Sequence, residues 1–301
     1  MELVKNGKSL LDAKYSQVKI EFNKEHGVLW TQLNQTGVPC MTLPLLKELQ
    51  HHNAAIESSG GILSVNDEPH RIQYSVSASL NPGVFSLGGQ LSLFRELIRS
   101  RNRDALMHYG RECVLTQLSR INRFYLPLTT LALVEGDALG GGFEGVLVCD
   151  VIIAEQGCQM GFPEILFNLF PGMGAYNLLA RKVGTALAEK LILSGKMYSS
   201  EELYEMGVVD VLAEKGRGRD AIFEYVRRQE KRSNGFQAVQ RVRQKYNPVT
   251  YQELMDVIHI WVDAALNLNE RDLKVMDRFV RSQERMFLTK PVVQEQEYLI
   301  A

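Results

Sequence analysis

Two glycine-containing turns are places where backbone amides could bind a negatively charged oxygen. Phe85–Leu91 reads FSLGGQL and Gly136–Glu144 reads GDALGGGFE, and each leads into a segment with helical spacing. The first amides of a helix lack partners within it, so such turns can direct two N–H groups at one oxygen. Neither turn has the spacing of a phosphate loop, GxxxxGK(S/T), or of a dinucleotide loop, GxGxxG. Tight packing is the alternative explanation for the glycines.

Two glutamates accompany the second turn. Glu144 follows the three glycines directly, and Glu164 lies twenty positions later in the segment GFPEI. Both have apolar neighbours, and burial of a carboxyl group raises its pKa toward the range that suits acid–base catalysis. The alternative is a pair of solvated or ion-paired glutamates, which is the commoner state of this residue. Residue type alone does not decide between the two.

Composition and charge exclude several classes of protein. The chain has 301 residues, of which 45% are hydrophobic, and 34 basic against 35 acidic residues give a net charge of −1. This is typical of a soluble globular protein and provides no global field for nucleic acid. The most membrane-like window, 165–180, is short and interrupted by proline and glycine, so we expect no membrane insertion. The N-terminal segment lacks signal-peptide features, and we expect a cytoplasmic protein.

Neither cysteines nor histidines form a metal-binding pattern. The four cysteines have no CxxC spacing and apolar neighbours, which favours reduced thiols in the core. The six histidines show neither HExxH nor zinc-finger spacing. We therefore expect no metal and no cofactor.

Hydrophobic periodicity indicates an α/β body followed by helices. A hairpin is expected at 18–22 and 28–33, with strands at 72–80, 128–134, 150–154 and 208–212 and helices at 44–58, 90–100 and 103–123. Helices are also expected at 217–232, 235–246, 250–266 and 269–288. Periodicity alone leaves open a doubly wound sheet or a spiral of ββα units. We expect a core over 1–215 that holds the two turns and the two glutamates, and a helical region over 216–301 that serves packing and oligomerisation.

The motifs resemble those of the crotonase, or enoyl-CoA hydratase/isomerase, superfamily. The similar segments are GDALGGGFEGVLVCD at 136–150, FPEILFNLFPG at 162–172 and LILSG at 191–195, and the FSLGGQL turn is similar to the family's FSAGADL. The resemblance covers about residues 15–215. It implies a crotonase-like spiral of ββα units with a helical C-terminal region, and a homotrimer or higher oligomer.

The resemblance also implies roles for the two turns. The backbone amides of Leu87 and Gly141 would be the oxyanion donors that hold a thioester carbonyl, with Gly88 and Gly140 beside them against the substrate. Charge that develops on that oxygen during the reaction would be stabilised there.

Glu144 and Glu164 match the two catalytic glutamates of family members that add or remove water. Loss of water from a 3-hydroxyacyl thioester needs a base for the C2 proton and an acid for the C3 hydroxyl group. We assign Glu164 as the base and Glu144 as the acid, and the reverse assignment satisfies the same chemistry.

Departures from the family pattern point to one branch. Leu87 and Gln90 replace alanine and aspartate, and basic residues that often bind CoA phosphates are missing before the first turn. Arg95, Arg99, Arg101 and Arg103 follow it, a cluster that could dock acidic acyl carrier protein or simply be a solvated face.

The LGGQL form of the first turn, the long helical insert at 104–123 and the tail with Trp261 are similar to the diffusible-signal-factor synthases. That resemblance implies a dehydratase and thioesterase that converts 3-hydroxyacyl-carrier protein to the cis-2-enoyl form and releases a free cis-2-unsaturated fatty acid for quorum sensing. It also implies a sensor histidine kinase as a partner. The alternatives are an enoyl-CoA hydratase of fatty-acid breakdown and a binding protein on the same scaffold.

An apolar helical stripe that includes Trp261 is a candidate wall for the acyl chain. Met173 and Phe279 are further candidates. Core packing is the alternative explanation for such a stripe.

Overall fold

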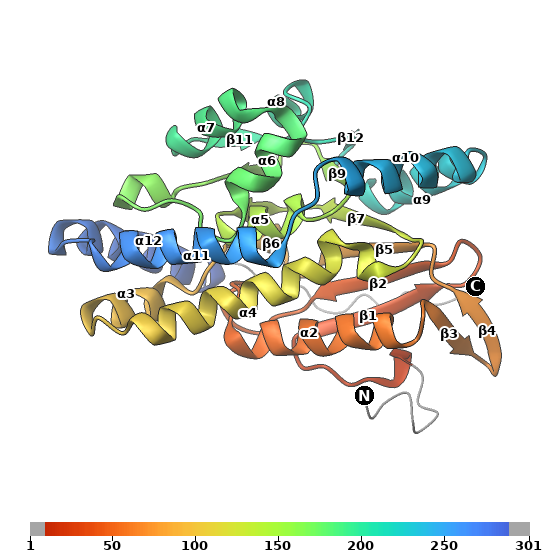
Figure 1. Ribbon diagram of the computed structural model, residues 1–301, viewed down its shortest axis with the longest axis horizontal. Helices are drawn as coiled ribbons and strands as arrows, with labels where there is room; N and C mark the ends of the chain where they lie inside the picture. Colours follow the sequence, from red (N-terminus) through yellow and green to blue (C-terminus); the bar gives the residue numbers. More distant parts are fainter. Residues whose placement is uncertain (1–9, 289–301) are drawn as a thin grey trace.

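The strands form two main sheets. The computed structural model describes residues 10–288, and its larger sheet has the strand order β1-β2-β5-β7-β9-β12 (Figure 1). Only β1 and β2 pair antiparallel, as the expected hairpin, and the other neighbours in this sheet are parallel. Its strands are β1 (Val18–Asn23), β2 (Val28–Leu33), β5 (Tyr74–Ser79), β7 (Thr129–Val134), β9 (Val151–Glu155) and β12 (Val211–Ala213).

The second sheet shows that the fold is a spiral of ββα units. Its four strands, in the order β11-β10-β8-β6, are β6 (Val84–Ser86), β8 (Asp137–Leu139), β10 (Gln159–Gly161) and β11 (Met197–Ser199). The chain passes from β5 to β6, from β7 to β8 and from β9 to β10, and thus adds one strand to each sheet per turn. A doubly wound sheet is thereby excluded, and the α/β class is confirmed.

The helices cover these sheets, and their sequences explain where they begin. Thr42 caps α2 by accepting a hydrogen bond from the amide of Leu45, and a proline occupies the first turn. The helices and 3-10 turns before residue 210 are η1 (Leu10–Asp12), α2 (Leu43–Ser58), α3 (Leu91–Arg99), α4 (Arg103–Ile121), η2 (Arg123–Tyr125), α5 (Gly141–Leu147), η3 (Glu164–Phe167), α6 (Ala175–Val183), α7 (Thr185–Leu193) and α8 (Ser200–Glu205). A small hairpin of β3 (Ile62–Val65) and β4 (Glu68–Arg71) was not expected from the sequence.

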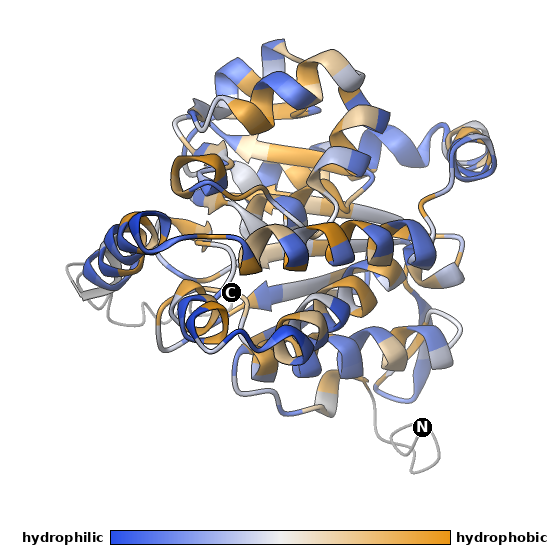
Figure 2. Ribbon diagram, turned by 60° about the vertical axis from the view of Figure 1, so that its left-hand side comes forward, coloured by the Kyte–Doolittle hydropathy of each residue, from blue (hydrophilic) through white to orange (hydrophobic). Residues whose placement is uncertain are grey.

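The central strands β7 and β9 of the larger sheet are buried on both faces. All six residues of β7 and all five of β9 are buried, as expected for parallel strands between helical layers. In Figure 2, hydrophobic residues gather on the strands and the inner faces of the helices, while the outward faces are hydrophilic. None of the helices in residues 10–288 is both long and apolar enough to cross a membrane.

The C-terminal helices do not form a unit apart from the core. They are α9 (Gly218–Glu230), α10 (Ser233–Tyr246), α11 (Tyr251–Leu266) and α12 (Glu270–Leu288). Helix α9 packs on strands β7, β9 and β12, whereas α11 lies on α4 and α12 lies on α3 and η3 (Figure 1). The expected boundary between 215 and 216 therefore marks no break between two cores. Helices α11 and α12 instead cover the elements that hold the candidate site.

Candidate active site

The turn after β6 directs one backbone amide into a pocket. The carbonyl oxygen of Gly88 accepts a hydrogen bond from the amide of Met41 at 2.8 Å. In a trans peptide the C=O and N–H bonds point in opposite directions, so the amide of Gly89 faces away from Met41. Gly89 lines the pocket. Gly88 has φ +91°, and a Cβ there would lie 2.7 Å from the carbonyl oxygen of Leu139, so only glycine fits.

Leu87, the donor expected from the resemblance, is already engaged. Its amide donates to the carbonyl oxygen of Pro39 at 2.7 Å. This amide cannot also hold a substrate oxygen, and we therefore replace Leu87 with Gly89 as the first candidate donor. The sequence carries no signal for this shift, because the partner that engages Leu87 lies 48 positions away in the chain.

The second amide belongs to the first residue of α5. Gly141 follows Gly140, which has φ +51° and whose carbonyl oxygen accepts the amide of Glu144 at 3.0 Å. A Cβ on Gly141 would lie 3.4 Å from the amide nitrogen of Gly89, so the two amides are neighbours. Across residues 10–288 neither amide donates a hydrogen bond. Together they can bind one oxygen with partial negative charge.

Glu144 is buried beside these amides and held by one of its two oxygens. Its Oε1 accepts the backbone amides of Met173 at 2.7 Å and Ala175 at 3.1 Å. Its other oxygen, Oε2, would lie 3.7 Å from a Cβ on Gly141. Burial raises the pKa of Glu144 to about 7, although the two bound amides act in the opposite direction.

Glu164 begins η3 on the other side of the glycine turn. Its Oε2 is buried, and no described residue forms a hydrogen bond with it. Its Oε1 lies so close to Gly140 that a Cβ there would be 2.2 Å away. Burial and then the negative charge of Glu144 raise the pKa of Glu164 to about 8. The expected pair of carboxyl groups thus shares one site, with pKa values suited to opposite protonation states.

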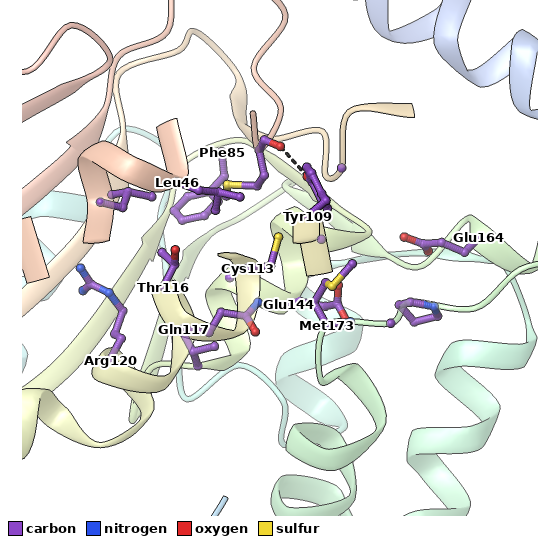
Figure 3. Close-up of a pocket in the computed structure, with 18 of the residues that line it drawn as sticks. Leu46, Phe85, Tyr109, Cys113, Thr116, Gln117, Arg120, Glu144, Glu164 and Met173 are labelled. Carbon is purple, nitrogen blue, oxygen red and sulfur yellow. Dashed lines mark hydrogen bonds between the residues drawn. The ribbon is translucent and has the colours of Figure 1, made fainter. Parts of the chain in front are cut away.

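A largely apolar pocket extends from this pair into the protein (Figure 3). Two of the expected wall residues, Trp261 and Met173, line it. A Cβ on Gly172 would lie 2.3 Å from the Trp261 ring, so the ring lies directly against the backbone. Apolar lining residues near the glutamates also include Met41, Leu46, Phe85, Leu91, Phe94, Cys113, Phe167 and Leu169.

Three residues expected to contact the substrate, Phe279, Gly88 and Gly140, do not line the pocket. Phe279 does not line the pocket; its ring packs against Phe167, with the centroids 5.5 Å apart, where α12 meets η3. Gly88 and Gly140 shape the two turns, but the pocket wall is formed by the following residues, Gly89 and Gly141. A sequence pattern cannot separate such neighbours, because the distinction depends on the peptide orientation.

The expected basic surface is used inside the chain. Arg95 pairs with Asp277 at 2.6 Å and Arg99 with Glu270 at 3.4 Å. Arg103 also forms an ion pair, with Asp263 of α11, and Arg101 donates to the carbonyl oxygen of Leu266 at 3.4 Å. The cluster thus fastens α11 and α12 to α3 and α4.

Helix α12 also contacts the first turn directly. Gln283 Nε2 donates to the carbonyl oxygen of Leu87 at 2.8 Å. On the other side of the turn, the hydroxyl group of Tyr109 in α4 donates to the carbonyl oxygen of Met41. Sequence patterns predicted both helices but neither of these hydrogen bonds.

The described residues contain no group of three or more histidine, cysteine or acidic side chains that could hold a metal ion. The four cysteines are free and buried. Burial raises the pKa of Cys40 and Cys149 to about 11 and that of Cys158 to about 12.

This fold and this pair of glutamates beside two free amides define a protein of the crotonase class. Residues 67–247, more than half of the chain, match the family model described as enoyl-CoA hydratase/isomerase. The chain belongs to this family.

Individual relatives share parts of the sequence. The 2,3-dehydroadipyl-CoA hydratase of Escherichia coli is 40% identical over 91 residues, which are 30% of this chain and 35% of that protein. A probable enoyl-CoA hydratase of Bacillus subtilis is 33% identical over 127 residues, 42% of this chain and 47% of the relative. These matches span less than half of the curated relatives.

Solved structures share the fold over most of their length. Human mitochondrial delta3-delta2-enoyl-CoA isomerase aligns with a TM-score of 0.73 and 17% identity over 90% of this chain and 99% of that one. Enoyl-CoA hydratase from Bacillus halodurans aligns with a TM-score of 0.68 and 21% identity, over 89% and 100%. Pseudomonas aeruginosa DspI aligns with a TM-score of 0.62 and 20% identity, over 90% and 97%.

Proposed function

We propose that the protein catalyses the reversible addition of water to the C2–C3 double bond of a 2-enoyl thioester. The observation that carries this proposal is the pair Glu144 and Glu164 beside the free amides of Gly89 and Gly141. Adding water requires one group that takes a proton from water and one that gives a proton to C2, while charge develops on the thioester oxygen. The site contains one candidate for each task.

The thioester oxygen accepts hydrogen bonds from Gly89 and Gly141. Glu144 is ionised at neutral pH more readily than Glu164, since the pKa of Glu164 is also raised by the charge of Glu144. Glu144 then takes a proton from water, the hydroxide oxygen bonds to C3, and the resulting enolate takes the proton of Glu164 at C2. In the reverse direction Glu164 is the base and Glu144 the acid, which agrees with the assignment from sequence.

The decisive experiment follows the enoyl thioester absorbance in wild type, Glu144→Gln and Glu164→Gln. Each variant is expected to lose about 10²–10⁴ in rate, the usual contribution of a positioned proton donor or acceptor. Labelled water distinguishes hydration from double-bond isomerisation, because only hydration places solvent oxygen on C3. Wild-type turnover by both folded variants would disprove the proposal.

The same donors serve a second candidate function. Gly89 and Gly141 can also stabilise the oxyanion of a thioester under attack by water, so a dehydratase that also releases a free cis-2-enoic acid needs no further oxyanion site. We propose this more specific activity as the second candidate, with acyl carrier protein as the carrier. Mass spectrometry tests it after the protein is mixed with a 3-hydroxyacyl carrier protein and, separately, with 2-enoyl-CoA thioesters. Free acid from the carrier-protein substrate supports this activity. Hydration of the CoA thioesters without release of free acid from either substrate excludes it.

A further inference from the structure

The inner end of the pocket, away from Glu164, carries several polar residues among apolar ones such as Leu46. It is lined by Thr31, Asn53, Ser77, Thr116, Gln117 and Arg120, which come from β2, α2, β5 and α4. In Figure 3, Thr116, Gln117 and Arg120 lie on the side of Glu144 opposite Glu164. An acyl chain bound with its thioester between the glutamates therefore extends toward these residues.

Arg120 is a buried cation without an acidic partner. Its residue exposure is 7%, and its Nη1 donates to Ser75 Oγ at a long 3.4 Å. Its guanidinium also forms a hydrogen bond with the Cys149 side chain and lies 5.3 Å from the centre of the Phe124 ring. Within residues 10–288, no carboxylate forms an ion pair with it. The other buried arginine, Arg123, has Asp150 at 2.8 Å. A buried charge without a counter-charge is costly, so Arg120 favours an oxygen ligand from outside the chain.

Two amide side chains at the same end have unused acceptors. The Oδ1 of Asn53 and the Oε1 of Gln117 are buried, and neither has a hydrogen-bond partner among the described residues. Asn53 is 2% exposed, and its Nδ2 donates to the carbonyl oxygen of Thr116 at 3.0 Å, which fixes its orientation. A plain methyl terminus would leave these two oxygens without partners and Arg120 without a counter-charge, which lowers affinity for such a chain.

We propose that this inner end binds an oxygen-bearing group, a hydroxyl or carboxyl, at the far end of the acyl chain. Such a group accepts from the Arg120 guanidinium, and a hydroxyl or protonated carboxyl group also donates to the amide oxygens of Asn53 or Gln117. This inference rests on the proposed hydration reaction and names its substrate class. The preferred substrate is an acyl thioester with an oxygenated terminus, in place of a plain alkyl chain.

The test compares 2-enoyl thioesters in a chain-length series, each made with a methyl, hydroxymethyl or carboxyl terminus. At the best length, an oxygenated terminus is expected to exceed the methyl terminus by about tenfold or more in kcat/KM, as for a site whose buried polar groups need partners. If the carboxyl terminus gives the highest kcat/KM, pairing with Arg120 is the main contact. If the hydroxymethyl terminus does, the amide oxygens of Asn53 and Gln117 are the main contact.

Gln117→Leu supplies a second readout that does not remove the buried charge. It is expected to reduce the ratio of kcat/KM for the oxygenated terminus to that for the methyl terminus several-fold. Gln237→Leu on α10 makes the same chemical change away from the pocket, at a side chain that bonds Thr129 Oγ1, and leaves the preference unchanged. Arg120→Met tests the charge itself, with circular dichroism to verify folding.

Failure of this inference is distinct from failure of the proposed reaction. If methyl-terminated thioesters are hydrated as well as oxygenated ones, and Gln117→Leu leaves the ratio unchanged, the inner end is structural only and the hydration reaction stands. If no enoyl thioester of any terminus is hydrated, the proposed reaction itself is wrong.

Discussion

The two glutamates differ in what holds them, and this difference sets their roles. Glu144 is fixed by two backbone amides, whereas one oxygen of Glu164 is buried without a partner. The fixed carboxylate is suited to orienting a water molecule. Glu164, whose charged form is less favoured, is suited to carrying a proton at neutral pH.

The pH dependence of hydration follows from this pair. With pKa values of about 7 for Glu144 and about 8 for Glu164, the productive state needs Glu144 ionised and Glu164 protonated. We expect kcat/KM to decrease when the pH is lowered below about 7 and when it is raised above about 8. The profile then has a narrow maximum between these two pH values. Initial rates across this interval measure it, and a rate independent of pH there would contradict the assignment.

Gly140 is expected to be essential for the position of Glu164. Gly140→Ala places a methyl group 2.2 Å from Glu164 Oε1 at a residue with φ +51°, so the carboxyl group must move. We expect a loss of about 10²-fold or more in rate with a cooperative thermal transition retained. Gly145→Ala is the matched control in the same helix, because its Cβ meets only Met41 Cε at 3.6 Å. Equal activity of both variants would show that Glu164 is not held by this contact.

The oxyanion turn is held by elements from both ends of the chain. Helix α4 fixes Met41 through Tyr109, Met41 binds the carbonyl oxygen of Gly88, and α12 binds that of Leu87 through Gln283. Two peptide planes are thereby fixed from outside the turn. The free amide of Gly89 is a consequence of this arrangement.

Gln283 is accordingly expected to be a positioning residue. Gln283→Leu keeps the size of the side chain but removes the hydrogen bond to Leu87, so the turn gains freedom. We expect kcat to fall several-fold, with little change in KM and in the melting temperature. The exposed neighbour provides the control, Glu284→Gln, which is expected to behave as wild type. A change in KM alone would indicate a role in substrate access.

Most elements could be predicted from the sequence, and the contacts between them could not. The helices expected at 250–266 and 269–288 are observed at 251–266 and 270–288, because their apolar spacing is regular. The hairpin β3–β4 was missed because it is short and has Pro69 in a strand, which argues against sheet structure. The glutamate pair was found by motif, whereas Leu87 was chosen wrongly because its engagement depends on a distant carbonyl group.

At the scale of the whole molecule, one chain provides every group of the candidate site. Amides follow β6 and β8, the carboxyl groups lie on α5 and η3, residues of α4 and α11 line the pocket, and α12 packs on α3 and η3. The ion pairs of Arg95, Arg99 and Arg103 hold this cover in place.

The stability of the fold should also depend on the buried carboxyl groups. Their pKa values in the folded protein, about 7 and about 8, exceed the ordinary 4.5, so the folded state binds more protons than the unfolded chain between these values. The free energy of unfolding must then decrease as pH rises from about 4.5 to about 8. Each unit by which a pKa is raised corresponds to about 1.4 kcal/mol. Denaturant titrations of the double variant Glu144→Gln/Glu164→Gln are expected to show a smaller decrease, and an unchanged slope would contradict the raised pKa values.

The burial of all four thiols has a practical consequence for labelling experiments. Each is shielded from solvent and remains protonated at neutral pH, so maleimide reagents should react slowly with the folded protein. A single cysteine introduced on the exposed face of α12, for example in place of Glu284, would then carry a fluorophore selectively. The natural sequence thus needs no cysteine removal before the distance between α12 and the body of the protein is followed by fluorescence.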